Sequence, residues 1–126
     1  MKTNQVIPFI VEWLKTYAKN SKVNGFVIGV SGGVDSAVTS TLCAMTGLKV
    51  MCLEMPIHQS ESHVSRAQEH INQLKKKFQN VQSNQINLTP VFDSFKGEID
   101  LQQPEKSVDM ALANSRARLR MTTLYY

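Results

Sequence analysis

Residues 29–36 carry the residue types with the clearest chemistry in this sequence. They read Gly-Val-Ser-Gly-Gly-Val-Asp-Ser and stand between a short apolar run and a segment with helical spacing. Two adjacent glycines let the backbone adopt positive φ and approach an anion closely, so that successive N–H groups point into one concavity. The first N–H groups of a following helix add to the same attraction. The segment therefore predicts a phosphate-binding loop.

The polar side chains of this loop indicate how phosphate and metal would be held. Ser31 and Ser36 can donate hydroxyl hydrogen bonds to phosphate oxygens. Asp35 repels phosphate unless a cation lies between them, so we assign it to Mg²⁺. The alternative is that the glycines only form a turn and that Asp35 is a first-turn acid favoured by the helix dipole. The loop is not a Walker loop, because Gly-Lys-Ser/Thr is missing, and it lacks the three-glycine dinucleotide fingerprint.

The elements that must position the loop follow from the spacing of apolar residues. Three short segments bounded by turn residues are predicted strands: residues 26–30, which form an apolar run, and residues 49–55 and 85–88. Four segments with apolar residues three and four positions apart are predicted helices, and the first two are residues 6–17 and residues 35–46. The third begins at Ser60 or Ser62, and its apolar stripe reaches Phe78. The fourth begins at Ser107 or Asp109 and runs to Tyr126. Gly47 is predicted to end the second helix, and Pro90 is predicted to end the third strand. Residues 80–84 are predicted to form a loop. Residues 93–104 fit either a short helix or a loop.

Strands that alternate with helices indicate an α/β fold, a Rossmann-like parallel sheet with flanking helices and right-handed crossovers. The strand that carries a phosphate loop normally lies inside such a sheet, so further strands are expected after Tyr126. We therefore interpret residues 1–126 as the N-terminal portion of a single larger domain, truncated after three strands. The alternative is a complete small protein whose exposed sheet edge is covered by a partner.

Charge and composition limit the partners. The formal net charge is +4, but the lysine run at 75–77 ends a predicted helix, and the three arginines near the C-terminus lack the interleaved aromatic residues of nucleic-acid surfaces. We therefore expect a small anionic ligand and no nucleic acid. No apolar run approaches the roughly 18 residues of a membrane span, which predicts a cytoplasmic protein without membrane contact.

The cysteines and histidines give weaker signals. Cys43 and Cys52 stand in apolar runs without metal-site spacing, so both are interpreted as small buried hydrophobic residues. His63 and His70 stand seven positions apart on one predicted helix with no acidic partner, and are interpreted as helix-surface residues. His58 lies either on the surface or near the nucleotide.

The last predicted helix carries three arginines that point in different directions. At 100° per residue, Arg116 and Arg120 lie about 40° apart, and Arg118 points to nearly the opposite side. Two apolar stripes run along this helix, one of Val108, Leu112, Leu119 and Tyr126 and the other of Met110, Ala113, Ala117, Met121 and Leu124. Two stripes predict burial on two sides, against the chain's own sheet and against a second subunit. An ordinary core helix with arginines at its edges is the alternative.

The loop resembles the pyrophosphatase loop, SGGxDS, of the ATP pyrophosphatase superfamily. Residues 114–121, Asn-Ser-Arg-Ala-Arg-Leu-Arg-Met, resemble the N-x-[KR]-A-R-x-R-M run of the NAD synthetase family, and the resemblance covers residues 25–126. It implies an adenine nucleotide alpha hydrolase-like fold and a ligase that forms a C–N bond in two steps. ATP adenylates the nicotinate carboxylate of deamido-NAD with release of pyrophosphate, and ammonia then displaces AMP to give NAD.

The resemblance also implies residue roles. Binding of ATP is assigned to Gly29, Val30, Ser31, Gly32, Gly33, Val34, Asp35 and Ser36, and binding of Mg²⁺ to Asp35. Arg118 matches the family arginine that contacts deamido-NAD, and the helix at 107–126 matches a homodimer interface. Arg116 and Arg120 are interpreted as charges at the subunit interface or at the end of the helix. Met55 and Pro56 stand where the family receives adenine, although residues 57–59 depart from the family's Tyr-Gly or His-Gly form.

Two other functions remain open on the sequence. A tRNA-modifying ligase of the same superfamily also uses the SGGxDS loop, but it would be expected to add basic RNA-binding segments. A non-catalytic ATP-binding or dimerisation module is compatible with a sheet of only three strands. The sequence holds no glutaminase nucleophile region, so free ammonia is the expected nitrogen source. The 126-residue chain by itself is expected to be weakly active or inactive.

Overall fold

The computed structural model describes residues 2–102 and 109–126, with side chains described for residues 2–99 and 110–126. Eight elements follow one another along the chain: α1 (Thr3–Asn20), β1 (Gly25–Gly29), α2 (Val34–Met45), β2 (Lys49–Glu54), α3 (Glu61–Lys77), β3 (Val81–Gln85), α4 (Thr89–Gln102) and α5 (Asp109–Tyr125). Of the two predicted starts of the last helix, Asp109 agrees with the structure; Ser107 lies outside the described residues, as does Val108.

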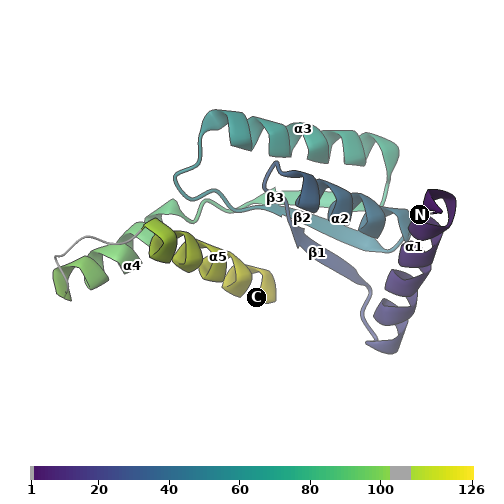
Figure 1. Ribbon diagram of the computed structural model, residues 1–126, viewed down its shortest axis with the longest axis horizontal. Coiled ribbons are helices and arrows are strands. Elements are labelled where there is room, and N and C mark those ends of the chain that lie inside the picture. The colour runs from purple at the N-terminus through teal and green to yellow at the C-terminus, as the bar shows by residue number, and fades with distance from the viewer. Residues whose placement is uncertain (1, 103–108) are drawn as a thin grey trace.

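The three strands form one parallel sheet in the order β1-β2-β3. Gly25 pairs with Lys49 at one end of the β1 ladder, and Val50 pairs with Val81 at the start of the next. Helices α2 and α3 lie on one face, whereas α4 and α5 lie on the other and toward one end (Figure 1). The predicted Rossmann-like α/β fold is therefore confirmed. None of the described helices is both long and apolar enough to cross a membrane.

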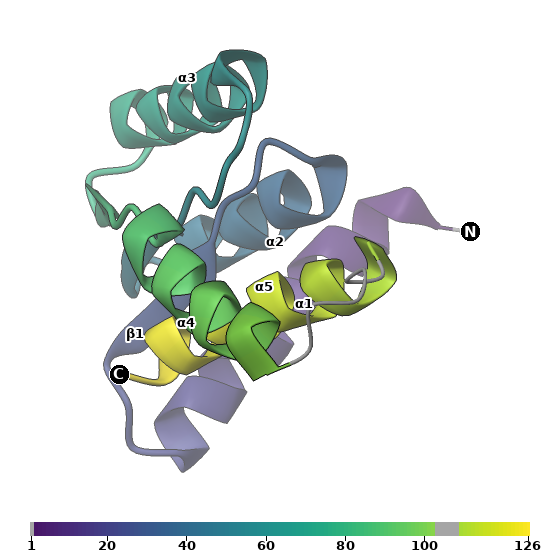
Figure 2. The same cartoon turned by 90° about the vertical axis from the view of Figure 1, so that its left-hand side faces the viewer.

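Each face of the sheet has its own apolar cluster, because alternate residues of a strand point to opposite faces. The cluster under α2 and α3 consists of Val30, Cys43, Ala44, Val50, Cys52, Ala67, Ile71, Leu74 and Val81. The cluster under α4 and α5 consists of Leu53, Met55, Ile57, Leu88 and Phe92, with Leu112, Leu119 and Leu124 of α5 packed against it. Figure 2 views the molecule from the end where α4 and α5 lie.

Both cysteines belong to the cluster under α2 and α3, as predicted. Cys52 is fully buried and Cys43 nearly so, and neither forms a disulfide. Burial raises the pKa of Cys43 from its usual 9.0 to about 11, and the proximity of Cys52 acts in the same direction. A thiol with so high a pKa is a poor nucleophile at neutral pH. The cysteines therefore serve packing.

The predicted third strand, residues 85–88, is wrong. The observed strand is Val81–Gln85, in the segment predicted as a loop, and Val81 is its one buried residue. A polar edge strand gives no apolar run, so the sequence pattern misses it. Residues 86–88 continue alongside β2 without forming a regular strand: Ile86 N donates to Glu54 O at 2.8 Å and Leu88 N to Pro56 O at 3.0 Å.

Pro90 does not close a strand but stands in the first turn of α4, where its missing N–H would have no helical partner in any case. The ambiguous segment 93–104 is helical as far as Gln102. Helix α4 thus begins directly after the extended residues 86–88. It carries Phe92 into the cluster beneath α5.

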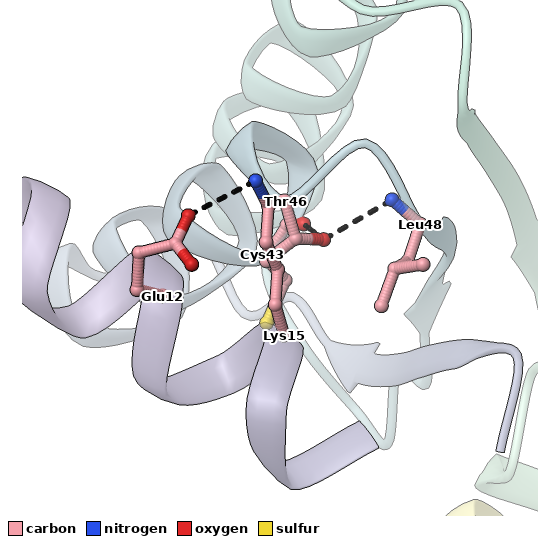
Figure 3. Close-up of polar contacts among 5 residues, drawn as sticks. All are labelled: Glu12, Lys15, Cys43, Thr46 and Leu48. Atoms are coloured by element: carbon pink, nitrogen blue, oxygen red, sulfur yellow. Dashed lines mark hydrogen bonds and ion pairs between the residues drawn. The ribbon is translucent and has the colours of Figure 1, made fainter. Parts of the chain in front are cut away.

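The end of α2 agrees with the sequence. Gly47 has φ +77°, the left-handed conformation expected of a glycine after a helix. Thr46 Oγ1 donates to Cys43 O at 2.6 Å and accepts from Leu48 N at 3.2 Å, which ties the turn to the start of β2 (Figure 3). The same view shows the ion pair between Lys15 and Glu12 on α1.

Helix α1 is longer than predicted and only partly buried. It spans Thr3–Asn20, and its buried residues are Val11 and Ala18. Ile7 and Tyr17, which belong to the predicted apolar stripe, are 47% and 57% exposed, so the prediction of a single buried face holds only in part. The helix packs mainly against α2, and its Leu14 contacts the cluster under α2 and α3.

Candidate nucleotide-binding site

The phosphate loop, residues 29–36, lies at the carboxyl edge of the sheet, as predicted. Val30 N still donates to Leu53 O at 2.8 Å, so the strand pairing extends one residue beyond β1 before the chain turns. Gly33 then takes the N-cap position of α2 with no side-chain cap of its own. Because no side chain satisfies the first N–H groups of α2, they remain available to an anion.

Gly32 brings the loop against α3. Its φ is +86°, and a Cβ at this position would lie 2.9 Å from His63 O and 3.4 Å from Ala67 N. Both the backbone conformation and the close approach therefore require glycine. Helix α3 forms the wall behind the loop.

The two serines of the loop hold its shape. Ser31 N donates to Ser36 Oγ at 3.1 Å, and Ser36 Oγ donates to Gly33 O at 3.2 Å. Gly33 N and Ser31 Oγ are 3.4 Å apart, a long and weak hydrogen bond. The loop is thus preformed, and its weakest internal hydrogen bonds can be exchanged for bonds to phosphate oxygens.

Asp35 is exposed in the first turn of α2. Within the described residues, no group of three or more His, Cys, Asp or Glu side chains could hold a metal by itself. Mg²⁺ is commonly held by one or two carboxylates together with substrate phosphates and water. A single carboxylate beside a phosphate loop therefore fits Mg²⁺ that arrives with a polyphosphate.

A cleft of about 370 Å³ opens between the loop and α5. It is lined by Gly29, Val30, Ser31, Met55, Gln59, Ala117, Arg120, Met121 and Leu124. Its walls are mainly apolar, which suits a planar base, and of the described residues that line it Arg120 carries the charge. Arg120 Nε donates to Met55 O at 2.9 Å, so the guanidinium is fixed on the end of β2.

A second cleft of about 390 Å³ adjoins the first and shares Arg120 and Gln59 with it. His58 and Arg116 also line it, and His58 Nε2 lies 2.5 Å from Asp93 Oδ1 of α4. The guanidinium of Arg116 stands over the ring of Phe92, 5.8 Å from its centroid. Among the described side chains, no carboxylate lies within ion-pair distance of Arg116 or Arg120.

The two arginines repel one another. Burial, and then the charge of Arg116, lower the pKa of Arg120 below its usual value. Two cations that pair with none of the described carboxylates, at the edge of a cleft, attract an anion, because its charge relieves both the desolvation and the repulsion. The geometry of the site is therefore a preformed anion-binding loop beside an apolar cleft edged with cations.

Comparison with known proteins identifies the family. A sequence model described as NAD synthase matches residues 6–126, nearly the whole chain. The chain belongs to the NAD synthase family. Among relatives, the NH(3)-dependent NAD(+) synthetase of Mesoplasma florum is 36% identical over 99% of this chain, and that of Saccharolobus solfataricus is 35% identical over 95%.

Solved structures of NAD synthetases share this fold. An NMN synthetase from Francisella tularensis superposes with a TM-score of 0.86 at 30% identity, and an NH3-dependent NAD synthetase from Campylobacter jejuni with 0.81 at 30% identity, each over 99% of this chain. The chain spans about half the length of the relatives it matches, 49% of the protein from Mesoplasma florum and 51% of the Campylobacter jejuni structure. The family match does not favour a tRNA-modifying ligase or a non-catalytic module.

The arginine motif of the NAD synthase family divides in this structure as the helical angles predict. Arg116 and Arg120 are half-buried at the clefts, whereas Arg118 is exposed and lines neither of them. Sequence reasoning gave Arg120 no place in the site. The angular separation of Arg116 and Arg120 from Arg118 was the available signal, but it did not tell which side faces the loop. The role of Arg118 stays a prediction.

The histidines also differ from expectation. His63 is exposed as predicted, and its Nδ1 lies 2.8 Å from Ser60 Oγ at the start of α3. His70 is half-buried and its Nε2 lies 2.8 Å from Ser40 Oγ, so the interpretation of His70 as a helix-surface residue holds only in part. Burial lowers the pKa of His70 from its usual 6.5. A contact between residues thirty positions apart leaves no signal in a helical pattern.

Glu54 ends β2 at the same edge of the sheet, and burial raises the pKa of its carboxyl from the usual 4.5. The folded state therefore binds the Glu54 proton more tightly than the unfolded state does. Protonated Glu54 contributes its full share of stability below the unfolded pKa of about 4.5, and this share is lost as the pH rises through the folded pKa.

Glu54→Gln should stabilise the protein at pH 8 and have a much smaller effect at pH 4.5. Urea denaturation at both pH values checks this, with the exposed Glu69→Gln as the control; equal effects of Glu54→Gln at the two pH values would contradict it.

Proposed function

We propose that the chain supplies the ATP-binding part of a ligase that converts deamido-NAD to NAD. The observation that supports this best is the arrangement of the preformed loop, which packs against α3 through Gly32, beside a cleft that Arg120 lines with its positive charge. The loop suits a pyrophosphate group, and the mainly apolar cleft suits adenosine. Membership of the NAD synthase family agrees with this chemistry.

The reaction divides into two steps. A carboxylate oxygen of the nicotinate attacks the α-phosphorus of ATP, and the bond to the β-phosphate breaks. The pyrophosphate leaves with its electron pair and stays in the loop, where backbone N–H groups, the hydroxyls of Ser31 and Ser36 and the positive end of α2 stabilise its charge. Ammonia then attacks the carbonyl carbon of the adenylated acid and releases AMP. Mg²⁺, when bound, would neutralise charge on the departing pyrophosphate, and Asp35 would hold it.

The two cationic residues of the clefts suit the phosphates between adenosine and the reacting carboxylate. Arg120 is held in place by Met55 O, so its remaining N–H groups can meet a phosphate oxygen without losing further side-chain entropy. Such pre-organised donors raise the affinity for a ligand chiefly because less side-chain entropy is lost when the ligand binds. Arg116 would add a second positive charge from the adjoining cleft.

The exposed face of α5 supports the homodimer that we propose to form through residues 107–126. Met110 is 72% exposed and lines neither of the two clefts. Apolar side chains of this size are costly to leave in water. In such a dimer Arg118 would lie in the interface and could contact deamido-NAD bound to the other subunit.

The test is a product assay on the protein as the cell makes it, with the 126-residue chain assayed beside it. We expect AMP and pyrophosphate in equal amounts, with formation dependent on both deamido-NAD and ammonia, and little turnover by the 126-residue chain alone. Nicotinate mononucleotide is the competing acid, because one relative is named an NMN synthetase. Asp35→Asn should raise the Mg²⁺ concentration needed for activity. Formation of ADP, or turnover without either acid, would sink the proposal.

A further inference from the structure

A buried polar contact joins α2 to α3 directly behind the phosphate loop. Ser40 is fully buried in α2, and its Oγ lies 2.8 Å from His70 Nε2 of α3. The same Oγ lies 2.7 Å from Ser36 O and 3.1 Å from Ala37 O. A buried hydroxyl without partners would cost stability, so this arrangement is a built contact.

The direction of these hydrogen bonds follows from counting protons. The hydroxyl of Ser40 has one proton, and Ser36 O and Ala37 O can only accept. If the hydroxyl donates to Ser36 O, the closer of the two carbonyls, then His70 Nε2 must carry a proton and donate to Ser40 Oγ. The chain of bonds therefore runs from His70 through Ser40 to the carbonyl of Ser36, whose own side chain holds the loop closed.

Helix α3 meets the loop a second time, about two turns earlier. The backbone of His63 and Ala67 lies against Gly32 so closely that a Cβ there would be 2.9 Å from His63 O. Any shift of α3 along or away from α2 would therefore move the wall behind Gly32. The bond from His70 to Ser40 resists such a shift.

We propose that His70 is a positioning residue for phosphate binding. Its hydrogen bond to Ser40 fixes α3 against α2, and this holds Gly32 and the first turn of α2 in the form that accepts a pyrophosphate. His70 does not touch the ligand. The inference rests on the proposed binding of a polyphosphate by the loop, and it adds a residue outside that loop on which the binding depends.

Asn80 provides a matched control at the opposite edge of the sheet. Its Nδ2 donates to Ala44 O at 3.0 Å and to Leu48 O at 2.7 Å, so it also ties α2 to a neighbouring segment. It does so at the C-terminal end of α2, on the side away from the loop. Asn80→Ala should therefore lower stability without altering the loop.

The experiment compares His70→Phe, His70→Gln and Asn80→Ala. Calorimetry measures the affinity for inorganic pyrophosphate with Mg²⁺, thermal melting measures stability, and hydrogen exchange measures the amide of Ser31, which bonds to Ser36 Oγ. His70→Phe removes the donor and should weaken pyrophosphate binding about tenfold and speed exchange at Ser31, as expected for the loss of one buried hydrogen bond. His70→Gln can donate from its amide and should restore most of the affinity. Asn80→Ala should bind as the wild type does.

Two results would overturn the proposal. One is unchanged affinity and exchange in His70→Phe; the other is a loss of affinity in Asn80→Ala as large as in His70→Phe at equal stability, which would make the contact merely structural. If the wild-type chain binds no pyrophosphate, the proposed function fails. Exchange at Ser31 then still decides whether His70 holds the loop.

Discussion

Gly32→Ala is expected to weaken the binding of both ATP and pyrophosphate strongly. The φ of +86° costs a residue with a side chain about 1–2 kcal/mol. The new Cβ would also lie 2.9 Å from His63 O, a backbone atom that cannot turn aside. The loop can relieve this contact only by leaving α3, and its N–H groups then no longer converge. Together these effects should weaken binding on the order of 100-fold or more, which corresponds to about 2.7 kcal/mol.

Variants of two other glycines distinguish the cost of the positive φ from the cost of the close contact with α3. Gly47 also has a positive φ, of +77°, but nothing lies within 4 Å of its Cβ position, so Gly47→Ala reports the conformational cost alone. Gly97 lies inside α4 with open space around it, and Gly97→Ala should be neutral or stabilising. Calorimetric titration with ATP and pyrophosphate, together with thermal melting, distinguishes the three variants. If Gly32→Ala bound as tightly as Gly47→Ala, the close approach of α3 would not be needed for binding.

The sequence predicts the loop well because its requirements are local. Positive φ at Gly32 and an uncapped helix start at Gly33 depend on residues that are adjacent in the chain. The first two strands are also predictable, because each contains a short apolar run, although no residue of β1 is fully buried and its Val27 is 52% exposed. Strand β3 is not, because it lies at the sheet edge and buries only Val81. Its pairing with β2 depends on backbone hydrogen bonds, which no side-chain pattern records.

Contacts between distant segments are the part of the site that the sequence could not supply. Helical periodicity placed Arg116 and Arg120 on one side of α5 and Arg118 on the other, and the structure agrees. It could not tell which side meets the loop, because that depends on how α5 packs against β1 and the cluster beneath it. The bond of His70 to Ser40 likewise depends on the packing of α3 on α2. Such choices are set by tertiary packing and not by local propensity.

Arg120→Ala is expected to weaken ATP binding by roughly 10-fold to 100-fold, the range for loss of a hydrogen bond to a charged group, about 1.5–3 kcal/mol. Among the described residues that line the cleft beside the loop, Arg120 alone carries a charge, and its bond to Met55 O fixes the direction of its guanidinium. Arg120→Lys keeps the charge but cannot reproduce a planar group held at Nε, so it should recover only part of the affinity. Because the contact is electrostatic, the difference between wild type and Arg120→Ala should shrink as salt is raised.

Arg118→Ala is the matched control, since it removes the same side chain two positions away on the exposed side of α5. ATP affinity measured by calorimetry should stay within about twofold of wild type, because an exposed charge outside the cleft is screened by salt. If Arg118 contacts deamido-NAD in a dimer, Arg118→Ala should instead raise the KM for deamido-NAD. If Arg118→Ala lost ATP affinity and Arg120→Ala did not, ATP would have to bind on the outer face of α5, and the cleft beside the loop would not be the nucleotide site.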